Sequence, residues 1–419
     1  MPQLRILISG AGIAGNALAF WLSNLGHKIT VIERFPHLRT SGLQVDLRGH
    51  GVEVMKRMGL EKAFRANAIP ELGMQVVDSA GRRRAYFPAS KTRSGAQSFT
   101  SEFEILRGDL CRMLYDATPK ERVRYVFGDS VEGFQDNDSG LQVRFTSGDS
   151  AQFDMLVGAD GLHSRTRKLM LQGSDVPDAF RSLDEYAAYF TIPRPMDDGE
   201  DYIATTYIAP GNRFLLTRRH RPDRIQVYLT GRSLTGQLNE VKRGDTVAQK
   251  SVLADVFQGA GWQVNEILES MMETDDFYCE SQGLVKLDPW YKGRVVLLGD
   301  AAYCPSASTG MGTSSALVGA YILAGEIARH CGSTGHQTFN TDAAFREYDE
   351  RFRPFMTQVQ QGVGDPSLFD KIPWSPFTIG VLHRIMWLVS HMRLDLFEGL
   401  LSDQPVKGWE LPEYESLRL

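Results

Sequence analysis

The sequence predicts an α/β fold in which a Rossmann-like dinucleotide-binding domain carries an inserted antiparallel sheet and a C-terminal helical segment. Three features predict it: a strand–glycine turn–helix–strand unit at the N-terminus, a central stretch of alternating strands, and a second glycine-rich strand–helix junction after it. We expect the dinucleotide-binding domain in residues 1–180 and 283–365. A substrate-binding domain with the antiparallel sheet is expected in 181–282, and the helical segment in 366–419.

Length and composition are those of an ordinary globular protein. The chain has 419 residues, 42% of them hydrophobic and 23% charged, enough for two or three domains' worth of core. A net charge of −5 gives no reason to expect a nucleic-acid partner. The four cysteines lack the close spacing of a metal or redox pair, which favours a reducing, cytoplasmic setting without a metal centre. The first strand begins at Leu4, so we expect no signal peptide, and we expect no transmembrane segment.

The N-terminal unit has the residues that a dinucleotide requires. An apolar run of strand length, residues 4–8, leads into a glycine-rich turn and then into a helical pattern of apolar residues. The glycines at three positions permit the tight turn, the approach of backbone N–H groups to a pyrophosphate, and close packing of helix on strand: Gly10, Gly12 and Gly15. Glu33 ends the next strand, where a carboxylate accepts hydrogen bonds from a ribose diol and repels a 2′-phosphate.

Several charged residues are site candidates because of where they stand. Arg39 and Asp46 lie in a polar loop after the second strand, at the sheet edge where open α/β folds bind ligands; the alternative is that they are solvated loop charges. Arg107 begins a helix, where the helix dipole disfavours a cation unless an anion lies nearby. Asp160 follows a buried strand at a further strand–Gly–Asp–Gly–helix junction, which is a tight turn as often as a site.

The pattern changes between Tyr186 and Gln282. Alternating strands rich in Tyr, Phe and Thr predict an antiparallel sheet with one buried face. Its candidates for a substrate pocket are Tyr189, Thr191, Tyr202, Phe214 and Tyr228. Alternation alone does not tell which face looks at the cofactor.

A second strand–helix junction has the same features as the first. An apolar strand, residues 295–298, ends in Gly299-Asp300, and a loop leads through Gly310 and Gly312 into a long helix. An acid at a strand end and a glycine-rich helix N-terminus again favour binding of a polar ligand. Two such junctions can hold the two ends of one long ligand. The chain has no second strand–GxGxxG–helix unit.

Together these motifs resemble the class A flavoprotein monooxygenases of the para-hydroxybenzoate hydroxylase fold. The resemblance spans residues 4–355, and its details are most similar to the tetracycline-inactivating monooxygenases at Arg39, Gly42, Asp46 and Gly59-Leu60. It implies that FAD is bound by Gly10, Gly12, Ala14, Gly15, Glu33, Arg34, Asp46, Arg107, Asp160, Gly299, Asp300, Gly310, Gly312 and Thr313. It also implies that Arg39 contacts the nicotinamide cofactor.

The resemblance implies an enzyme that uses NAD(P)H and O₂ to hydroxylate or epoxidise an aromatic or polycyclic small molecule through a flavin C(4a)-hydroperoxide. Such reactions belong to secondary metabolism or xenobiotic modification. The flavin carries this chemistry, so no catalytic side chain and no metal is required, and we expect a monomer or weak dimer. The second loop departs from the family pattern: Cys304-Pro305-Ser306 stands where many relatives carry Pro-Pro, and Thr313 stands where they carry Asn.

Three other functions share this fold. A flavin-dependent dehydrogenase or oxidative cyclase would use the same FAD site and put no oxygen into its product. A flavin halogenase would carry a Trp-x-Trp-x-Ile-Pro motif, which the sequence lacks. A degenerate flavoprotein that only binds ligands is the non-enzymatic alternative, and the intact acids Glu33 and Asp300 argue against it.

Residues 377–401 carry an amphipathic pattern near the C-terminus. We expect a helix there that packs over the core or the substrate mouth; a membrane surface and a partner helix are the alternatives.

Overall fold

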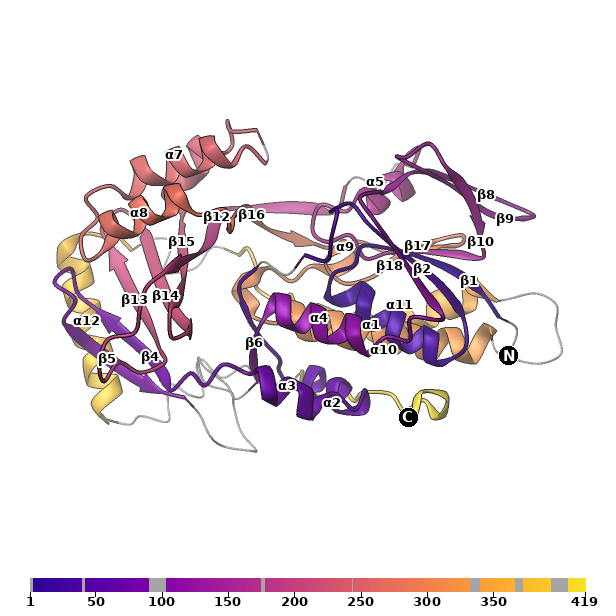
Figure 1. Cartoon of the computed structure of the whole chain (residues 1–419), viewed down its shortest axis with the longest axis horizontal. Coiled ribbons are helices and arrows are strands. Elements are labelled where there is room, and N and C mark those ends of the chain that lie inside the picture. The colour runs from indigo at the N-terminus through magenta and orange to yellow at the C-terminus, as the bar shows by residue number, and fades with distance from the viewer. Residues whose placement is uncertain are drawn as a thin grey trace.

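The computed structural model describes the chain in eight stretches: 3–39, 42–89, 103–174, 178–242, 244–331, 340–365, 372–392 and 406–419. Two sheets lie at opposite ends of its longest axis, a six-stranded sheet on the right of Figure 1 and a seven-stranded sheet on the left. Two long strands, β12 (Phe180–Pro193) and β16 (Phe277–Val285), reach from one part toward the other. The fold is therefore the predicted α/β architecture with a second, mainly antiparallel sheet.

The six-stranded sheet has the order β17-β18-β11-β1-β2-β7. Its parallel strands are β1 (Arg5–Ser9), β2 (Lys28–Glu33), β7 (Val123–Phe127), β11 (Met155–Gly158) and β18 (Val295–Leu297), with β17 (Tyr291–Lys292) antiparallel at the edge. The central strands are almost continuous apolar runs because both faces of the sheet are covered. β7 pairs with β2 in parallel and forms the other edge of the sheet.

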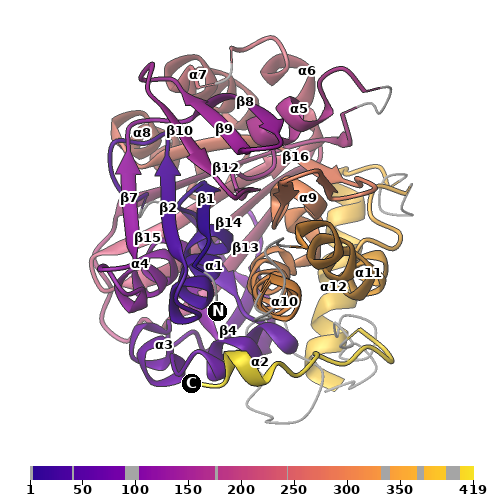
Figure 2. The ribbon, with the colours of Figure 1, turned by 90° about the vertical axis from the view of Figure 1, so that its right-hand side faces the viewer.

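Helices cover one face of this sheet and a small sheet covers the other, as Figures 1 and 2 show. The helices of the first face are α4 (Arg107–Ala117), α1 (Ile13–Asn24), α10 (Gly312–Cys331) and α11 (Thr341–Val359). The small sheet consists of β8 (Val131–Asn137), β9 (Gly140–Phe145) and β10 (Ser150–Phe153). Gly26 follows α1 with φ +91°, the left-handed conformation with which helices commonly end.

The seven-stranded sheet has the order β16-β12-β15-β14-β13-β4-β5. Its remaining strands are β13 (Ile203–Ala209), β14 (Arg213–Arg221), β15 (Arg224–Gly231), β4 (Gly73–Val77) and β5 (Arg83–Pro88). The range 181–282 therefore leaves out the hairpin β4–β5, which comes from the first part of the chain and adds to β13 in parallel. The boundaries of the domains stay a prediction.

Shorter elements complete the described chain. They are β3 (Gln44–Asp46), β6 (Glu104–Leu106), α2 (His50–Arg57), α3 (Glu61–Asn67), α5 (Arg165–Leu171), α6 (Thr235–Leu238), α7 (Thr246–Phe257), α8 (Val264–Glu273), α9 (Asp300–Tyr303) and three short 3₁₀ turns at Arg232–Leu234, Ala307–Thr309 and Glu415–Leu417. None of the described helices is both long and apolar enough to cross a bilayer.

The predicted amphipathic helix exists as α12 (Pro376–Met392), at the outer end of the seven-stranded sheet (Figure 1). It packs against β5 and β13, and Ile379 is its buried residue. Much of its apolar stripe faces outward, with Phe377 78% and Ile385 50% exposed. The helix thus lies on the outer end of the sheet; the part of the prediction beyond residue 392 falls on 393–401, outside the described residues.

Candidate functional site

The turn from β1 into α1 is shaped by its glycines. A Cβ atom at Gly10, whose φ is +111°, would lie 2.5 Å from the carbonyl oxygen of Ala159, and one at Gly15 would lie 1.9 Å from the carbonyl oxygen of Gly10. A Cβ atom at Gly12 would meet only Arg107, at 3.7 Å. Two of the glycines therefore allow close packing, whereas Gly12 leaves open the space before the helix. Gly12 caps α1 without a side-chain hydrogen bond, so the first N–H groups of α1 remain for a ligand.

Glu33 stands beside this turn at the end of β2. Its Oε2 accepts a hydrogen bond from the N–H of Ala11 at 2.9 Å, and its Oε1 accepts one from the N–H of Phe35 at 3.1 Å. The half-buried carboxylate is thus held where the ribose-binding acid was predicted. The next residue, Arg34, is exposed, and its guanidinium lies 5.0 Å from the ring centre of Phe35.

Arg107 begins α4 and reaches into the same space. Its backbone N–H donates to the carbonyl oxygen of Leu43 at 3.0 Å, and its Cδ lies 3.2 Å from where a Cβ atom of Gly42 would be. The Arg107 side chain therefore lies between the loop at residue 42 and the start of α1. A cation beside open N–H groups makes this space suitable for an anion.

The second junction meets the first in the folded chain. A Cβ atom at Gly299 would lie 3.0 Å from the Cβ of Ala14, and Oδ1 of Asp300 lies 3.8 Å from the Cβ position of Gly312, where α10 begins. Burial raises the pKa of Asp300, and a hydrogen bond with Cys304 opposes that rise. The structure thus brings Asp300 and the N-terminus of α10 close to α1.

The loop after β3 covers the start of α10. Asp46 forms an ion pair with Arg48, whose Nε lies 2.7 Å from Oδ2 of Asp46. The Arg48 guanidinium carbon lies 3.4 Å from the Cβ position of Gly310, and the Arg48 N–H donates to Oγ of Ser314 at 2.8 Å. Thr313 is half-buried in the first turn of α10. Arg48 was missed by sequence reasoning, although its place two residues after Asp46 was a signal.

Asp160 uses its carboxylate inside the protein. Oδ1 accepts from the hydroxyl of Ser164 at 2.5 Å, and Oδ2 accepts from the N–H and hydroxyl of Thr166 at 2.9 and 3.0 Å. Its Cα lies 3.1 Å from the Cβ position of Gly10. Asp160 therefore holds the start of α5 and abuts the glycine turn through its backbone, and a direct contact with a cofactor stays a prediction.

All these residues lie at one edge of the parallel sheet. Glu33 ends β2, and the other two acids follow β11 and β18, whose carboxyl ends meet at the same edge as that of β1. Acids at both ends, with open N–H groups and a cation between them, fit an extended dinucleotide whose pyrophosphate lies before α1. No cluster of His, Cys, Asp or Glu able to hold a metal ion is found in the described stretches.

A small pocket lies on the seven-stranded sheet next to this edge. Three predicted substrate residues line it, Tyr189, Thr191 and Tyr228, together with Tyr278 and with Gly42 of the loop before β3. Tyr189 stands opposite both Tyr228 and Tyr278 in the strand register. Tyr278, on β16, was missed; the alternation of Tyr278, Glu280 and Gln282 was its signal in the sequence.

Two predicted substrate residues do not line this pocket. Tyr202 precedes β13, and its carbonyl oxygen accepts the N–H of Leu72 at 2.8 Å. Phe214 packs edge-on against Trp374 with ring centres 5.1 Å apart.

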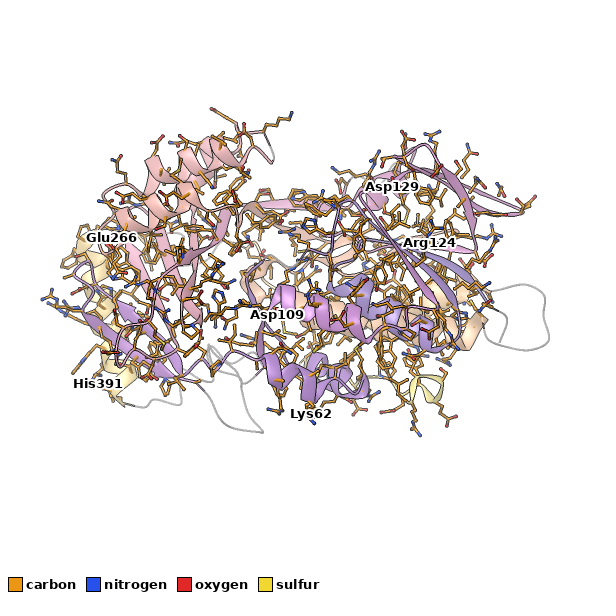
Figure 3. The ribbon with its side chains drawn as sticks, viewed as in Figure 1. Lys62, Asp109, Arg124, Asp129, Glu266 and His391 are labelled. Carbon is orange, nitrogen blue, oxygen red and sulfur yellow. The ribbon has the colours of Figure 1, made fainter. Side chains whose placement is uncertain are left out.

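Hydrogen bonds show which face of the sheet looks at the dinucleotide site. The N–H of Gln44, on β3, donates to Oε1 of Gln226 and to the hydroxyl of Tyr228, both at 3.0 Å. The Gln226 amide in turn donates to the carbonyl oxygen of Gly42 at 2.9 Å. The opposite face packs under α7 and α8 through buried Val227 and Leu229. In Figure 3 side chains fill the region between the two sheets, and Asp109 marks the start of α4 there.

Arg39 lies at the seam between the two parts. Its guanidinium carbon is 4.3 Å from the ring centre of Tyr278 and 5.5 Å from that of Phe35. Arg39 is therefore stacked on a ring of the pocket instead of extending into solvent as a loop charge would.

Comparison with known proteins indicates the family of the chain. Residues 3–362 match the protein family described as "FAD binding domain". The whole chain is 47% identical to the FAD-dependent monooxygenase asL4 of Sarocladium schorii, of which 99% is covered. It is 45% identical over 99% of its length to the flavin-dependent monooxygenase eupH of a Phoma species, of which 98% is covered. The solved structure of the tetracycline destructase Tet(51) is 30% identical, with a TM-score of 0.76 over 99% of this chain and 100% of that one.

Proposed function

The chain belongs to the FAD binding domain family and is an FAD-dependent monooxygenase, and from this premise we propose that it uses NAD(P)H and O₂ to hydroxylate or epoxidise an aromatic or polycyclic small molecule. One observation carries the proposal furthest: the open start of α1 lies at the same sheet edge as Glu33 and Asp300, beside a pocket of tyrosines.

When bound, FAD supplies the redox chemistry by accepting a hydride and activating O₂. The protein's part is to bind, orient and exclude water. Glu33 would hold the ribose diol, and the first N–H groups of α1, with Arg107, would hold the pyrophosphate. Asp300 and the N-terminus of α10 would hold the other end of the cofactor, where the helix dipole favours negative charge.

The aromatic side chains that line the pocket support an aromatic substrate. The rings of Tyr189 and Tyr228 stand edge to face, with centres 5.3 Å apart, and Tyr278 lies beside them. Burial raises the pKa of Tyr228 to about 12 and that of Tyr189 further, so both remain neutral hydrogen-bonding groups near pH 7. The likeness to a tetracycline destructase supports a fused-ring substrate.

NAD(P)H would bind transiently beside Arg39. Replacing this side chain in Arg39→Ala is expected to leave FAD bound and to slow anaerobic reduction by NAD(P)H by about tenfold, equivalent to about 1.4 kcal/mol. Stopped-flow absorbance of the flavin measures that rate. Arg144→Ala, on an exposed pair with Glu132 in the small sheet, serves as the control. An unchanged rate and nicotinamide affinity in Arg39→Ala would contradict a contact between Arg39 and the nicotinamide cofactor.

Turnover under ¹⁸O₂ tests the reaction class. A substrate screen scored by NAD(P)H consumption comes first, and mass spectrometry of the product follows. A product that gains one heavy oxygen supports the proposal. A product that loses two hydrogens, with the heavy oxygen recovered in peroxide, supports the alternative of a dehydrogenase or oxidative cyclase.

A further inference from the structure

A row of polar side chains leads from the tyrosine pocket to the surface of the molecule. Tyr278 lines the pocket, and its hydroxyl donates to Oε2 of Glu280, two residues along the same face of β16. The other carboxylate oxygen of Glu280, Oε1, lies 3.3 Å from Nε2 of His163. The side chains of Glu280 and His163 are each 20% exposed, so the row ends at solvent.

The contact between Glu280 and His163 crosses from one part of the molecule to the other. Glu280 belongs to an edge strand of the seven-stranded sheet, whereas His163 lies in the turn after β11 of the six-stranded sheet. The imidazole is held in place by the ring of Phe180, with centres 5.0 Å apart. The row is therefore built from side chains whose positions are fixed by three separate elements.

The groups around Glu280 place it near the predicted flavin site as well. Burial is the main cause that raises the pKa values of five groups around Glu280, and the negative charge of Glu280 raises them further. These groups are Asp300, Cys304, Tyr189, Cys279 and Tyr278. Arg39 opposes the rise at Tyr278. Glu280 thus lies near the predicted flavin site while its side chain stays 20% exposed.

The proposed reaction consumes a proton that the substrates do not bring. Written in full, RH + O₂ + NAD(P)H + H⁺ gives ROH + H₂O + NAD(P)⁺, so each turnover takes one proton from solution. An active site that excludes water needs a side-chain route for it.

We propose that His163, Glu280 and Tyr278 form a proton relay from solvent to the substrate pocket; this inference rests on the proposed function. The Nε2–H bond of His163 breaks as an Oε1–H bond forms on Glu280. The carboxyl group turns and passes the proton to Oη of Tyr278, while the hydroxyl proton of Tyr278 moves to the oxygen that leaves as water. No electrons are transferred along the relay, and His163 regains its proton from solvent.

Three substitutions interrupt the relay at separate points. Tyr278→Phe keeps the ring under Arg39 and removes the hydroxyl, Glu280→Gln keeps the shape and removes the exchangeable carboxyl proton, and His163→Phe keeps a ring against Phe180. Each is expected to slow oxygen-dependent turnover at least tenfold and to increase the solvent deuterium isotope effect on it. Anaerobic reduction by NAD(P)H is a hydride transfer that needs no proton, so it is expected to change much less. Glu132→Gln, at an exposed ion pair on the small sheet, is the matched control.

Rescue separates proton transfer from a structural role. If His163→Ala folds but turns over slowly, added imidazole is expected to restore the rate, since the position of His163 is reached by solvent. Wild-type turnover in His163→Phe without imidazole would overturn the relay. Variants that slow only the anaerobic reduction by NAD(P)H would also overturn it, and would leave these residues as supports for Arg39.

A spectroscopic measurement tests the contact without turnover. With 3,5-difluorotyrosine at position 278 of the holoenzyme, ¹⁹F NMR follows ionisation of this one hydroxyl. Glu280→Gln is expected to lower the pKa of that hydroxyl, because Glu280 raises it by its charge and by its hydrogen bond. An unchanged titration contradicts the contact. Failure of the wild type to incorporate ¹⁸O instead contradicts the proposed function, so the two failures are distinguishable.

Discussion

At the scale of a single residue, Asp300 lies where the two glycine-rich junctions meet. It follows a fully buried strand, lies next to the N-terminus of α10, and has its pKa raised mainly by burial. A carboxylate that is costly to bury is retained where it accepts hydrogen bonds from a ligand. Cys304, beside it, is buried with a thiol pKa raised well above its usual value, which favours an inert thiol over a reactive one.

Asp300→Ala is expected to weaken FAD binding by about thirtyfold, or about 2 kcal/mol, because it removes a buried, charge-assisted hydrogen bond. Titration of the apoprotein with FAD, followed by flavin fluorescence, gives the dissociation constant. Asp223→Ala, at an exposed ion pair with Arg224, is the control. Equal affinities of Asp300→Ala and wild type would place the cofactor elsewhere.

At the scale of an element, the turn between β1 and α1 contains one glycine required for packing and another that leaves space for binding. Gly15 has no room for a side chain because the carbonyl oxygen of Gly10 lies in its way. Gly12 has φ −77° and ψ −170°, a conformation that alanine adopts easily, and its neighbourhood is open. Gly15 is therefore required because a side chain would clash there, whereas Gly12 leaves space for a ligand.

Gly15→Ala is expected to lower the melting temperature of the apoprotein strongly, because helix and turn must move apart. Gly12→Ala is expected to lower that temperature much less, at a cost of about 0.5–1 kcal/mol, and to weaken FAD binding at least tenfold. Differential scanning calorimetry and FAD titration measure the two effects. Equal melting temperatures for the two variants would contradict this division of roles.

At the scale of the whole molecule, a buried ionic cluster connects the two parts. Arg218 of β14 donates to both oxygens of Glu71, at 2.9 and 2.6 Å, and to Glu104 of β6 at 2.5 Å. Gln44 of β3 also donates to Glu104. Two buried acids share this arginine, and burial raises the pKa of Glu71 while the charge of Arg218 lowers it.

Arg218→Met is expected to reduce the free energy of unfolding by about 3–5 kcal/mol, because it leaves two buried carboxylates without their cation. A buried acid with a raised pKa stabilises the fold when protonated, so the loss is expected to be smaller at pH 5 than at pH 8. Urea unfolding of wild type and Arg218→Met at pH 5 and pH 8 measures this loss of unfolding free energy. In the double variant Arg218→Met/Glu104→Gln part of the loss should return; a double variant no more stable than the single one would contradict a charge effect.

The sequence by itself determined the fold class, the cofactor and most local units. The confirmed strand–turn–helix unit at the N-terminus, the apolar strand before Gly299 and the long helix that begins at Gly312 follow from apolar periodicity and glycine positions, which act over a few residues. Glu33 and Asp300 were placed at strand ends for the same reason. The family match then agreed with the resemblance that these motifs carry.

Only the tertiary structure decided how distant segments meet. Strand register put Tyr278 beside Tyr189 in the pocket and left Tyr202 and Phe214 outside it. The helix of residues 376–392 turned much of its apolar stripe outward, away from the core. A hairpin from residues 73–88 completed the second sheet. Local patterns cannot predict these outcomes, because alternation is the same for either face of a strand, while pairing and docking depend on atoms far apart in the chain.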